Sequence, residues 1–180
     1  TSRRQRHMCI RDSGSSGGQD GSSAGTQTTT KTFTLTNLRS IPEGSGSATS
    51  GFSGKMAQGK YSSYKLHRGK ATIPSSALDF IKSATSIESV SLTCHRLNTS
   101  HGVSTAVPYP RMRLKNTSKG TYSSYYANSS VKFARGDTKT IPINNSSFKT
   151  FLLNGADELQ FYVASDGNPT QQYSCLLYTS

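Results

Sequence analysis

The sequence predicts an all-β domain, an antiparallel sandwich of about eight strands with one or two short helices in its loops. Short runs in which apolar and polar residues alternate recur along the chain, as they do in half-buried strands. Most gaps between these runs hold Ser-, Gly- and Asn-rich loops rather than the crossover helices that parallel strands require. The chain has 180 residues, of which 32% are hydrophobic, so we expect one domain with a single core.

The first strand is expected in KTFTLTNL, from Lys31, where Phe33 and Leu35 alternate with threonine. The segment before it, residues 13–30, consists mainly of Ser, Gly and Thr and carries one charged side chain. Such a segment buries too little apolar surface to offset its ordering entropy, which predicts a flexible arm. A Gly- and Ser-rich loop is expected over residues 43–59.

The middle of the chain predicts two strands separated by a short helix. The first strand is expected in KYSSYKLHRG and ends at Gly69. A helix is predicted in SSALDFIKSA, after Pro74, with Ser75 or Ser76 as its N-cap. The clearest strand is predicted in SIESVSLTCHRLN, where the spacing of apolar residues indicates one bulge. The residues expected on its buried face are Ile87, Val90, Leu92, Cys94 and Leu97.

The second half of the chain predicts further strands joined by turns. In PYPRMRLKN, Met112 and Leu114 are expected on one face and three basic residues on the other. More strands are predicted in TYSSYYANSSVKFA, TKTIPIN, ELQFYVAS and QQYSCLLYTS, with turns at residues 135–137 and 166–169. A second short helix is predicted in SSFKTFLLNG, closed by Gly155. Because these elements form no internal repeat and no parallel unit, they favour a jelly roll.

No arrangement of catalytic or metal-binding residues stands out in the sequence. P-loop, HExxH and GxGxxG motifs are absent. Asp157 and Glu158 are neighbours in a predicted strand and point to opposite faces, so they make a poor acid–base pair. Asp137 and Asp166 lie in predicted turns, and formation of those turns is the simpler explanation for both residues. The alternative is that they bind a calcium ion at a subunit contact. We therefore expect that the protein is not an enzyme and has no cofactor and no metal site.

The chain is strongly basic, with 21 Lys and Arg against 9 Asp and Glu and a formal net charge of +12. Such a surplus in one small domain indicates a polyanionic partner, most often nucleic acid. No apolar stretch approaches the roughly 18 residues that a membrane-spanning helix needs. We therefore expect nucleic acid, and not a membrane, as the partner.

Candidate nucleic-acid-binding residues lie in and around two of the predicted strands. Arg111, Arg113 and Lys115 share one strand face at a spacing of about 7 Å. That spacing resembles the separation of phosphates along a nucleic-acid strand, so the row can follow the backbone without reading bases. A solvated outer face explains the same row equally well. The predicted binding residues are Lys60, Lys65, Arg68, Lys70, Arg111, Arg113, Lys115 and Lys119.

Tyrosines accompany these basic residues. Their rings suit base stacking, and they suit subunit contacts as well, because tyrosine is enriched at protein interfaces. The tyrosines concerned are Tyr61, Tyr64, Tyr122, Tyr125 and Tyr126.

Three stretches of the sequence follow one another in an order that matches a known family. They are SSALDFIKSATSIESVSLTCHRLN, the late hairpin VKFARGDTKTIPI and the strand ELQFYVASDG. With the arm that precedes them, they resemble the single jelly-roll capsid proteins of small icosahedral viruses, such as satellite viruses and circular single-stranded DNA viruses. The resemblance covers residues 31–174. It implies a T=1 shell of about sixty copies that packages single-stranded RNA or DNA in a virion assembled in the host cytoplasm or nucleus.

A surface or secreted β-sandwich that binds carbohydrate or a protein partner is the alternative interpretation. Aromatic residues on a flat face serve such a module. The chain has no Trp, the residue best suited to stacking on sugars. Binding of a neutral glycan would also not explain the large positive net charge. The capsid interpretation is therefore preferred.

Both ends of the chain resemble translated sequencing adapter. The DNA sequence ATG TGT ATA AGA GAC AG encodes MCIRD and begins a serine codon, as at residues 8–13, and its reverse complement encodes CLLYT, as at residues 175–179. This DNA resembles the transposase end sequence of library adapters, so we interpret residues 1–12 and 175–180 as adapter-derived tails of a metagenomic gene fragment. The native protein is then expected to extend beyond both ends. Without residues 1–12 the chain keeps 17 basic and 8 acidic side chains, a charge of +9, and Cys94 is its one native cysteine.

Overall fold

The computed structural model describes residues 8–14, 27–42, 54–59, 67–97, 109–161 and 175–178. These residues form twelve strands and two helices. The strands are β1 (Met8–Gly14), β2 (Gln27–Phe33), β3 (Thr36–Pro42), β4 (Met56–Gly59), β5 (His67–Thr72), β6 (Ile87–Arg96), β7 (Arg111–Asn116), β8 (Thr121–Tyr122), β9 (Tyr126–Ala127), β10 (Thr138–Pro142), β11 (Glu158–Phe161) and β12 (Cys175–Tyr178). The helices are α1 (Ser75–Ser83) and α2 (Ser146–Leu153).

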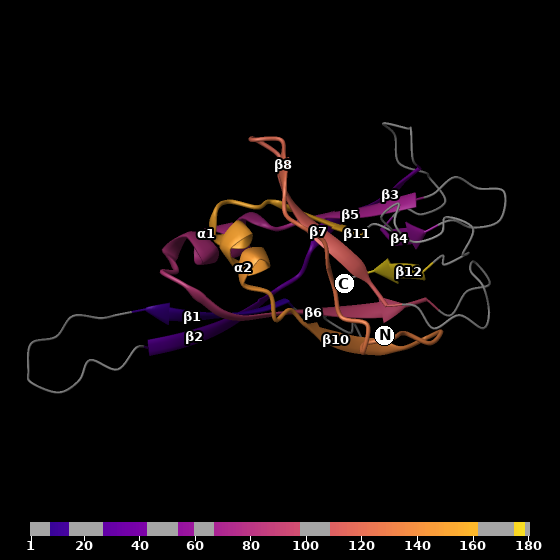
Figure 1. Cartoon of the computed structure of the whole chain (residues 1–180), viewed down its shortest axis with the longest axis horizontal. Coiled ribbons are helices and arrows are strands. Elements are labelled where there is room, and N and C mark those ends of the chain that lie inside the picture. Colours follow the sequence, from indigo (N-terminus) through magenta and orange to yellow (C-terminus); the bar gives the residue numbers. More distant parts are fainter. Residues whose placement is uncertain are drawn as a thin grey trace, which may run out of the picture.

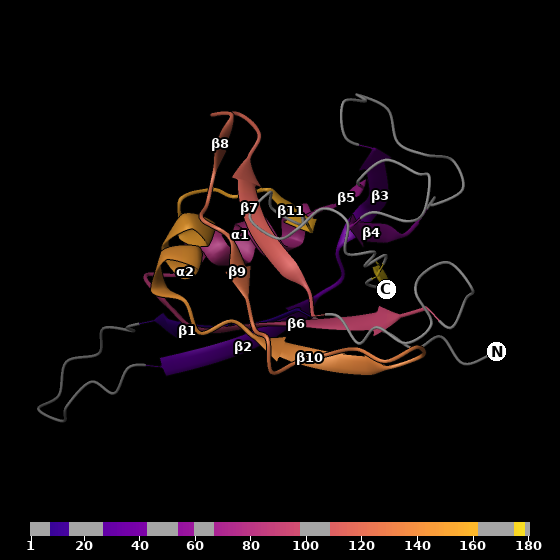
Figure 2. The ribbon, with the colours of Figure 1, turned by 45° about the vertical axis from the view of Figure 1, so that its right-hand side comes forward.

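All strand pairs in the described chain are antiparallel. The strands follow the order β2-β1-β6-β12-β4-β5-β11-β7-β8, with β10 beside β6, β3 beside β5 and β9 beside β7. The sheet folds over on itself, so that β1, β2, β6 and β10 form one layer and β3, β5, β7 and β11 form the other (Figures 1 and 2). The predicted all-β, antiparallel class is confirmed.

More strands are present than the sequence predicted. Two expected strands are each divided in two, β4 forms within an expected loop, and β1 forms near the start of the chain, mainly in residues interpreted as adapter-derived. The stretch KTFTLTNL splits at Thr34 and Leu35 into β2, which pairs with β1, and β3, which pairs with β5. The chain crosses between the layers at this point, and Leu35 is buried there. Strand β2 begins at Gln27, before the expected start at Lys31, because it pairs with β1 along its whole length.

The second predicted strand is shifted along the chain. Strand β5 begins at His67 and continues past the predicted end at Gly69 to Thr72, because it lies between β3 and β11 and pairs with both. Residues 60–66, the first part of that predicted strand, lie outside the described residues. Strand β4 occupies the end of the stretch that was expected to be a loop.

Apolar side chains from both layers meet in one core. The members contributed by β6, β7 and β11 are Val90, Leu92, Cys94, Met112, Leu114, Leu159 and Phe161. Each large side chain in such a core contributes roughly 1.5–3 kcal/mol relative to an exposed position. Cys94 is a buried free thiol, as the alternation of apolar residues predicted.

Both helices lie where the sequence predicted them, at one end of the sandwich (Figure 1). The predicted N-cap of α1 was wrong: Pro74 takes that position, and its carbonyl accepts from the backbone N–H of Ala77, so no serine side chain caps the helix. Helix α2 is capped by Asn145, whose Oδ1 accepts from the N–H of Phe148 at 2.8 Å. Gly155 follows α2 with a φ of 92°, in the left-handed region that glycine favours.

Strand β6 contains the predicted bulge. Opposite β1, its register passes from Ile87 to Ser89, so Glu88 is the extra residue. The buried face then continues through the predicted positions but ends at Arg96, which is 4% exposed, rather than at Leu97. The guanidinium of Arg96 donates to the carbonyl oxygen of Phe133 at 2.6 Å, which gives one of its buried N–H groups a partner.

Candidate nucleic-acid interface

The outer surface of the layer formed by β3, β5, β11 and β7 carries most of the predicted basic residues. On β7, Met112 and Leu114 are buried in the core. The basic residues that alternate with them therefore point outward, as predicted. The same alternation on β5 turns Arg68 and Lys70 outward, because Ala71 faces the core. We call this surface the cationic face, and its basic residues are Arg39, Arg68, Lys70, Arg111, Arg113 and Lys115.

Strand β11 aligns the residues of the cationic face. Gln160 lies opposite Lys70 on one side and Arg113 on the other, and Lys70 in turn lies opposite Arg39 on β3. These four residues form a row across four strands, about 14 Å long at the usual strand spacing. Glu158, two residues earlier on β11, lies opposite Lys115. The face thus holds six cations around one carboxylate.

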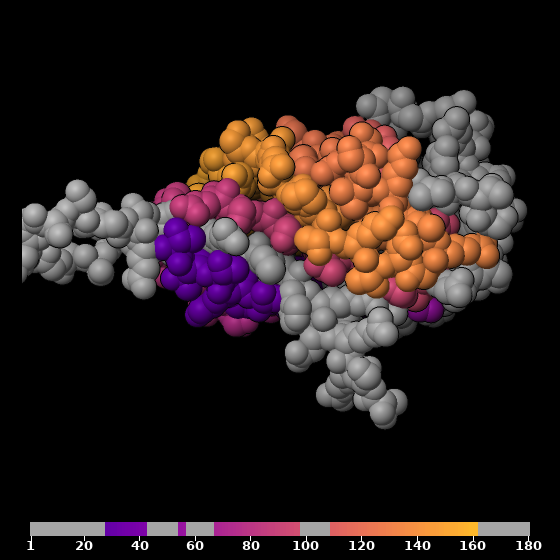
Figure 3. All heavy atoms as spheres, turned by 90° about the horizontal axis from the view of Figure 1, so that it is seen from below, coloured from indigo at the N-terminus to yellow at the C-terminus, as the bar shows by residue number. Residues whose placement is uncertain are grey.

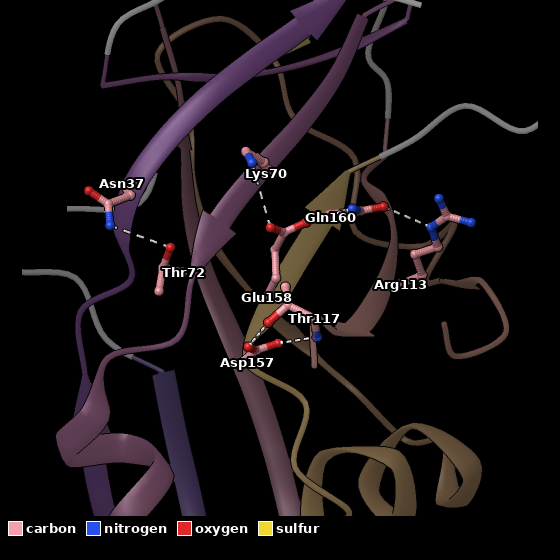
Figure 4. Close-up of polar contacts among 8 residues, drawn as sticks. All are labelled: Asn37, Lys70, Thr72, Arg113, Thr117, Asp157, Glu158 and Gln160. Carbon is pink, nitrogen blue, oxygen red and sulfur yellow. Dashed lines mark hydrogen bonds and ion pairs between the residues drawn. The ribbon is translucent and has the colours of Figure 1, made fainter. Parts of the chain in front are cut away.

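A chain of polar contacts crosses the three central strands of this face (Figure 4). The Nζ of Lys70 lies 3.7 Å from the Oε2 of Glu158. Gln160 donates from its Nε2 to the Oε1 of Glu158 at 2.6 Å and accepts from the Nε of Arg113 at 2.9 Å. Glu158 is 9% exposed and Gln160 is 2% exposed. Because the carboxylate can only accept, it orients the amide of Gln160, and that amide holds the guanidinium of Arg113.

Two tyrosines lie against the arginines of β7. The Cζ of Arg113 is 4.0 Å from the ring centroid of Tyr122 and 5.1 Å from that of Tyr125. The Cζ of Arg111 is 4.8 Å from the ring centroid of Tyr125, and the Nζ of Lys115 is 5.6 Å from that of Tyr122. These are cation–π distances. The row on β7 is therefore half-buried and held in place rather than fully solvated.

The hairpin between β7 and β8 positions Tyr122 directly opposite Lys115. Its turn is stabilised by Asn116, whose Oδ1 accepts from the Oγ of Ser118 at 2.8 Å and from the N–H of Lys119 at 3.0 Å. The φ of Gly120 is 64°, which closes the turn. Lys119 is exposed at this tip.

The first residue of this turn, Thr117, is hydrogen-bonded to Asp157, the residue just before β11. The Oδ1 of Asp157 accepts from the N–H of Thr117 at 2.8 Å, and its Oδ2 accepts from the Thr117 hydroxyl (Figure 4). Asp157 lies just before β11 and bonds to Thr117, whereas Glu158, the first residue of β11, pairs with Lys70.

The structure brings most of the predicted binding residues together. Five of them lie on the cationic face, and Lys119 lies at the hairpin tip beside it. Lys60 and Lys65 lie outside the described residues, as do Tyr61 and Tyr64. The five that share the face are Arg68, Lys70, Arg111, Arg113 and Lys115.

Sequence reasoning missed Arg39 and misjudged Tyr126. Arg39 is exposed on β3 between the buried Leu38 and Ser40, a pattern visible in TNLRSIP once the strand is extended past Leu38. Tyr126 does not join the other tyrosines. Its hydroxyl donates to the carbonyl oxygen of Pro142 at 2.7 Å, and its ring packs against Phe148 with 6.1 Å between centroids.

The outer surface of the other layer has a different character. On β6 and β10 its outward side chains pair through hydroxyl groups: the Oγ1 atoms of Thr93 and Thr140 are 2.8 Å apart, and the Nδ1 of His95 is 2.8 Å from the Oγ1 of Thr138. Figure 3 views the molecule from this side, with β2 in indigo and the chain around β10 in orange. Among the described side chains of this layer's strands, the exposed basic residues are Lys31 on β2 and Lys139 on β10, and Lys139 pairs with Asp137. The described part of this layer therefore carries fewer basic residues than the cationic face.

Asp137, for which the sequence left a turn residue and a calcium ligand as alternatives, is engaged in a turn. Its Oδ2 accepts from the Nζ of Lys139 and from the N–H of Ala134, both at 2.8 Å. The hydrogen bond from Lys139, followed by that from Ala134, lowers the pKa of Asp137 below its usual value. Asp166 lies outside the described residues. Within the described ranges, no three His, Cys, Asp or Glu side chains gather where they could hold a metal ion.

Comparisons with protein-family models, curated proteins and solved structures found no match for this chain. In the part of the chain that the structure describes, neither helix is long and apolar enough to cross a bilayer. The chemistry of the cationic face is therefore the main guide to function.

Proposed function

We propose that the protein is a viral capsid protein that assembles into a small icosahedral shell and packages single-stranded nucleic acid against its cationic face. The gathering of basic residues on one layer carries this proposal. The cationic face holds six cations around a single carboxylate, whereas the described exposed basic residues on the strands of the layer with β6 and β10 are Lys31 and Lys139. A protein whose basic residues gather on one side suits a shell that separates a polyanion from the solvent.

The order of the strands supports a jelly roll. In one layer β3, β5, β11, β7 and β9 lie side by side, and in the other β10 lies beside β6. Strands β1 and β2 extend the second layer, but β1 falls mainly on residues interpreted as adapter-derived and carries no weight here. Most neighbours within each layer are distant in sequence. Non-sequential order within two packed antiparallel sheets is typical of the two Greek keys that make a jelly roll of eight strands.

The cationic face is suited to phosphates without regard to sequence. Its basic groups come from β3, β5 and β7 and repeat at about 7 Å along a strand. Strands β3 and β5 are direct neighbours, and β11 separates β5 from β7. Groups so arranged can follow a flexible backbone, and neither RNA nor DNA is favoured by contacts to phosphate alone. Closed symmetry of about sixty copies would present these faces together on the inside of one shell.

Assembly is tested by sedimentation and electron microscopy of the purified chain, followed by nuclease digestion. We expect closed particles of uniform size that protect RNA or DNA from the nuclease. A monomer that binds no nucleic acid at any salt concentration would remove the proposal and favour a β-sandwich binding module instead.

The role of the cationic face is tested by charge reversal outside its polar contact chain. Arg39→Glu with Lys119→Glu changes two exposed cations at the face and at the hairpin tip. The matched control, Lys82→Glu with Lys132→Glu, changes two exposed lysines that lie elsewhere, on α1 and before β10. We expect the first pair to lower the slope of log K against log salt by about 1.4–1.8 and to reduce the packaged nucleic acid, and the control pair to change both far less. Equal effects of the two pairs would mean that the face has no special role.

A further inference from the structure

We propose that the cationic face also binds unpaired bases, by stacking them on the ring of Tyr122, so that it selects single strands over duplexes. This inference rests on the proposed nucleic-acid binding and adds a second kind of contact to it. Phosphate binding alone explains the basic residues. It does not explain why a large aromatic ring is exposed among them.

Tyr122 combines high exposure with a fixed position. It is 42% exposed, the highest value among the described large hydrophobic residues. The guanidinium of Arg113 lies over its ring at 4.0 Å, and pairing of β8 with β7 fixes its backbone opposite Lys115. Because Arg113 is itself held by Gln160, the ring rests on a support that reaches back to Glu158. The ring is therefore preorganised, and its exposed area is open to a flat partner.

The surroundings of the ring favour a nucleic acid over a protein as that partner. Lys115 and Arg113 lie within 5.6 Å of the ring centroid, and no acidic residue other than the buried Glu158 is found among the described members of the face. A base stacked on Tyr122 would bring its own phosphates beside these cations. In a duplex the bases are stacked on one another, so their faces cannot reach a side chain, whereas single strands expose them.

The test compares oligo(dT) with an abasic oligonucleotide of the same length, which has the same phosphates and no bases. Binding of both to the full chain is measured by fluorescence anisotropy for the wild type, Tyr122→Ala and Tyr122→Phe. We expect Tyr122→Ala to weaken oligo(dT) binding about 5- to 150-fold and to leave abasic binding unchanged. Tyr122→Phe keeps the ring and should keep most of the oligo(dT) affinity.

A second measurement reports stacking directly. The chain has no Trp, so Tyr122→Trp introduces a unique fluorophore whose emission oligo(dT) should quench and the abasic strand should not. Equal wild-type affinity for the two strands overturns base stacking and leaves phosphate binding intact. Failure to bind either strand overturns the proposed function itself. Loss of self-association in Tyr122→Ala, with oligo(dT) affinity unchanged, assigns the ring to a subunit contact and also overturns this inference.

Discussion

Gln160 accepts a hydrogen bond from the Nε of Arg113 at 2.9 Å and thereby joins β11 to β7, the strand that carries three of the six cations of the cationic face. The Nε2 of the same amide donates to the Oε1 of Glu158, and the carboxylate of Glu158 also pairs with Lys70. One neutral, buried side chain thus links a carboxylate on its own strand to an arginine on the neighbouring strand β7. The side chains of Lys70 and Arg113 are therefore positioned by these polar contacts as well as by the strands that carry them.

Replacement of Gln160 by methionine should destabilise the protein and disorder Arg113. The Oε1 of Glu158 loses a donor and the Nε of Arg113 loses an acceptor, both in a largely buried setting, so we expect the free energy of unfolding to fall by about 1–3 kcal/mol. Urea denaturation measures this change. Thr93→Val, which removes a hydroxyl pair from the other layer, serves as the control and should leave oligonucleotide affinity unchanged. Unaltered stability in Gln160→Met would contradict the link.

Neutralising Glu158 should strengthen nucleic-acid binding. Glu158→Gln removes the carboxylate of the cationic face, so that Lys70 becomes available to a phosphate. We expect tighter binding of single strands at low salt and a slope of log K against log salt that is steeper by about 0.7. Glu88→Gln makes the same charge change at an exposed position of β6 and should have a much smaller effect. If both variants behave alike, only the net charge of the chain matters.

Asp137 should stabilise the turn before β10 in a pH-dependent way. Its pKa is lowered in the folded protein by the hydrogen bonds from Lys139 and Ala134, so its contribution is complete above the unfolded pKa and is lost as the pH falls through the lower folded pKa. We expect the difference in Tm between the wild type and Asp137→Asn to shrink as the pH drops below about 4. Asp79→Asn, on the exposed side of α1, makes the same substitution elsewhere and serves as the control. A Tm difference that stays constant down to low pH would disprove this account.

Gly155 and Gly120 both have a positive φ, so their replacement by alanine compares the loss of stability at two positions with different surroundings. Gly155 has a φ of 92°, and a Cβ there would lie 3.4 Å from the Nδ2 of Asn116. Gly120 has a φ of 64°, and a Cβ added there would meet nothing within 4 Å. We expect Gly120→Ala to cost about 1–2 kcal/mol of stability from the left-handed conformation alone, and Gly155→Ala to cost more. Thermal unfolding compares the two, and a smaller loss for Gly155→Ala would rule out the crowding at Asn116.

Much of the fold could be predicted because it depends on local patterns. The alternation of Met112 and Leu114 with basic residues predicted both faces of β7, and the spacing after Ile87 predicted the bulge of β6. Both helices were found from their apolar spacing and from Gly155. The division of KTFTLTNL could not be predicted, because alternation continues through Leu35 while the pairing partner of the backbone changes there.

The candidate site could be predicted only in part. The row on β7 and the cations of β5 were visible as alternating residues, but sequence spacing says nothing about which strands become neighbours. Arg39, Lys70, Gln160 and Arg113 lie far apart in the chain and form one row because β11 is inserted between β5 and β7. Tyr122 and Tyr126 differ by four residues, yet one lies over Arg113 and the other packs on Phe148.

By itself, the sequence determined the strand-rich class, the basic charge and the outward direction of individual basic residues, because these follow from composition and from the two-residue repeat of a strand. Only the tertiary structure decided that the cations of three strands gather on one surface around Glu158, and that tyrosines lie against them. The physical reason is that strand neighbours are chosen by long-range backbone pairing and by the shared core, which no local stretch of residues encodes.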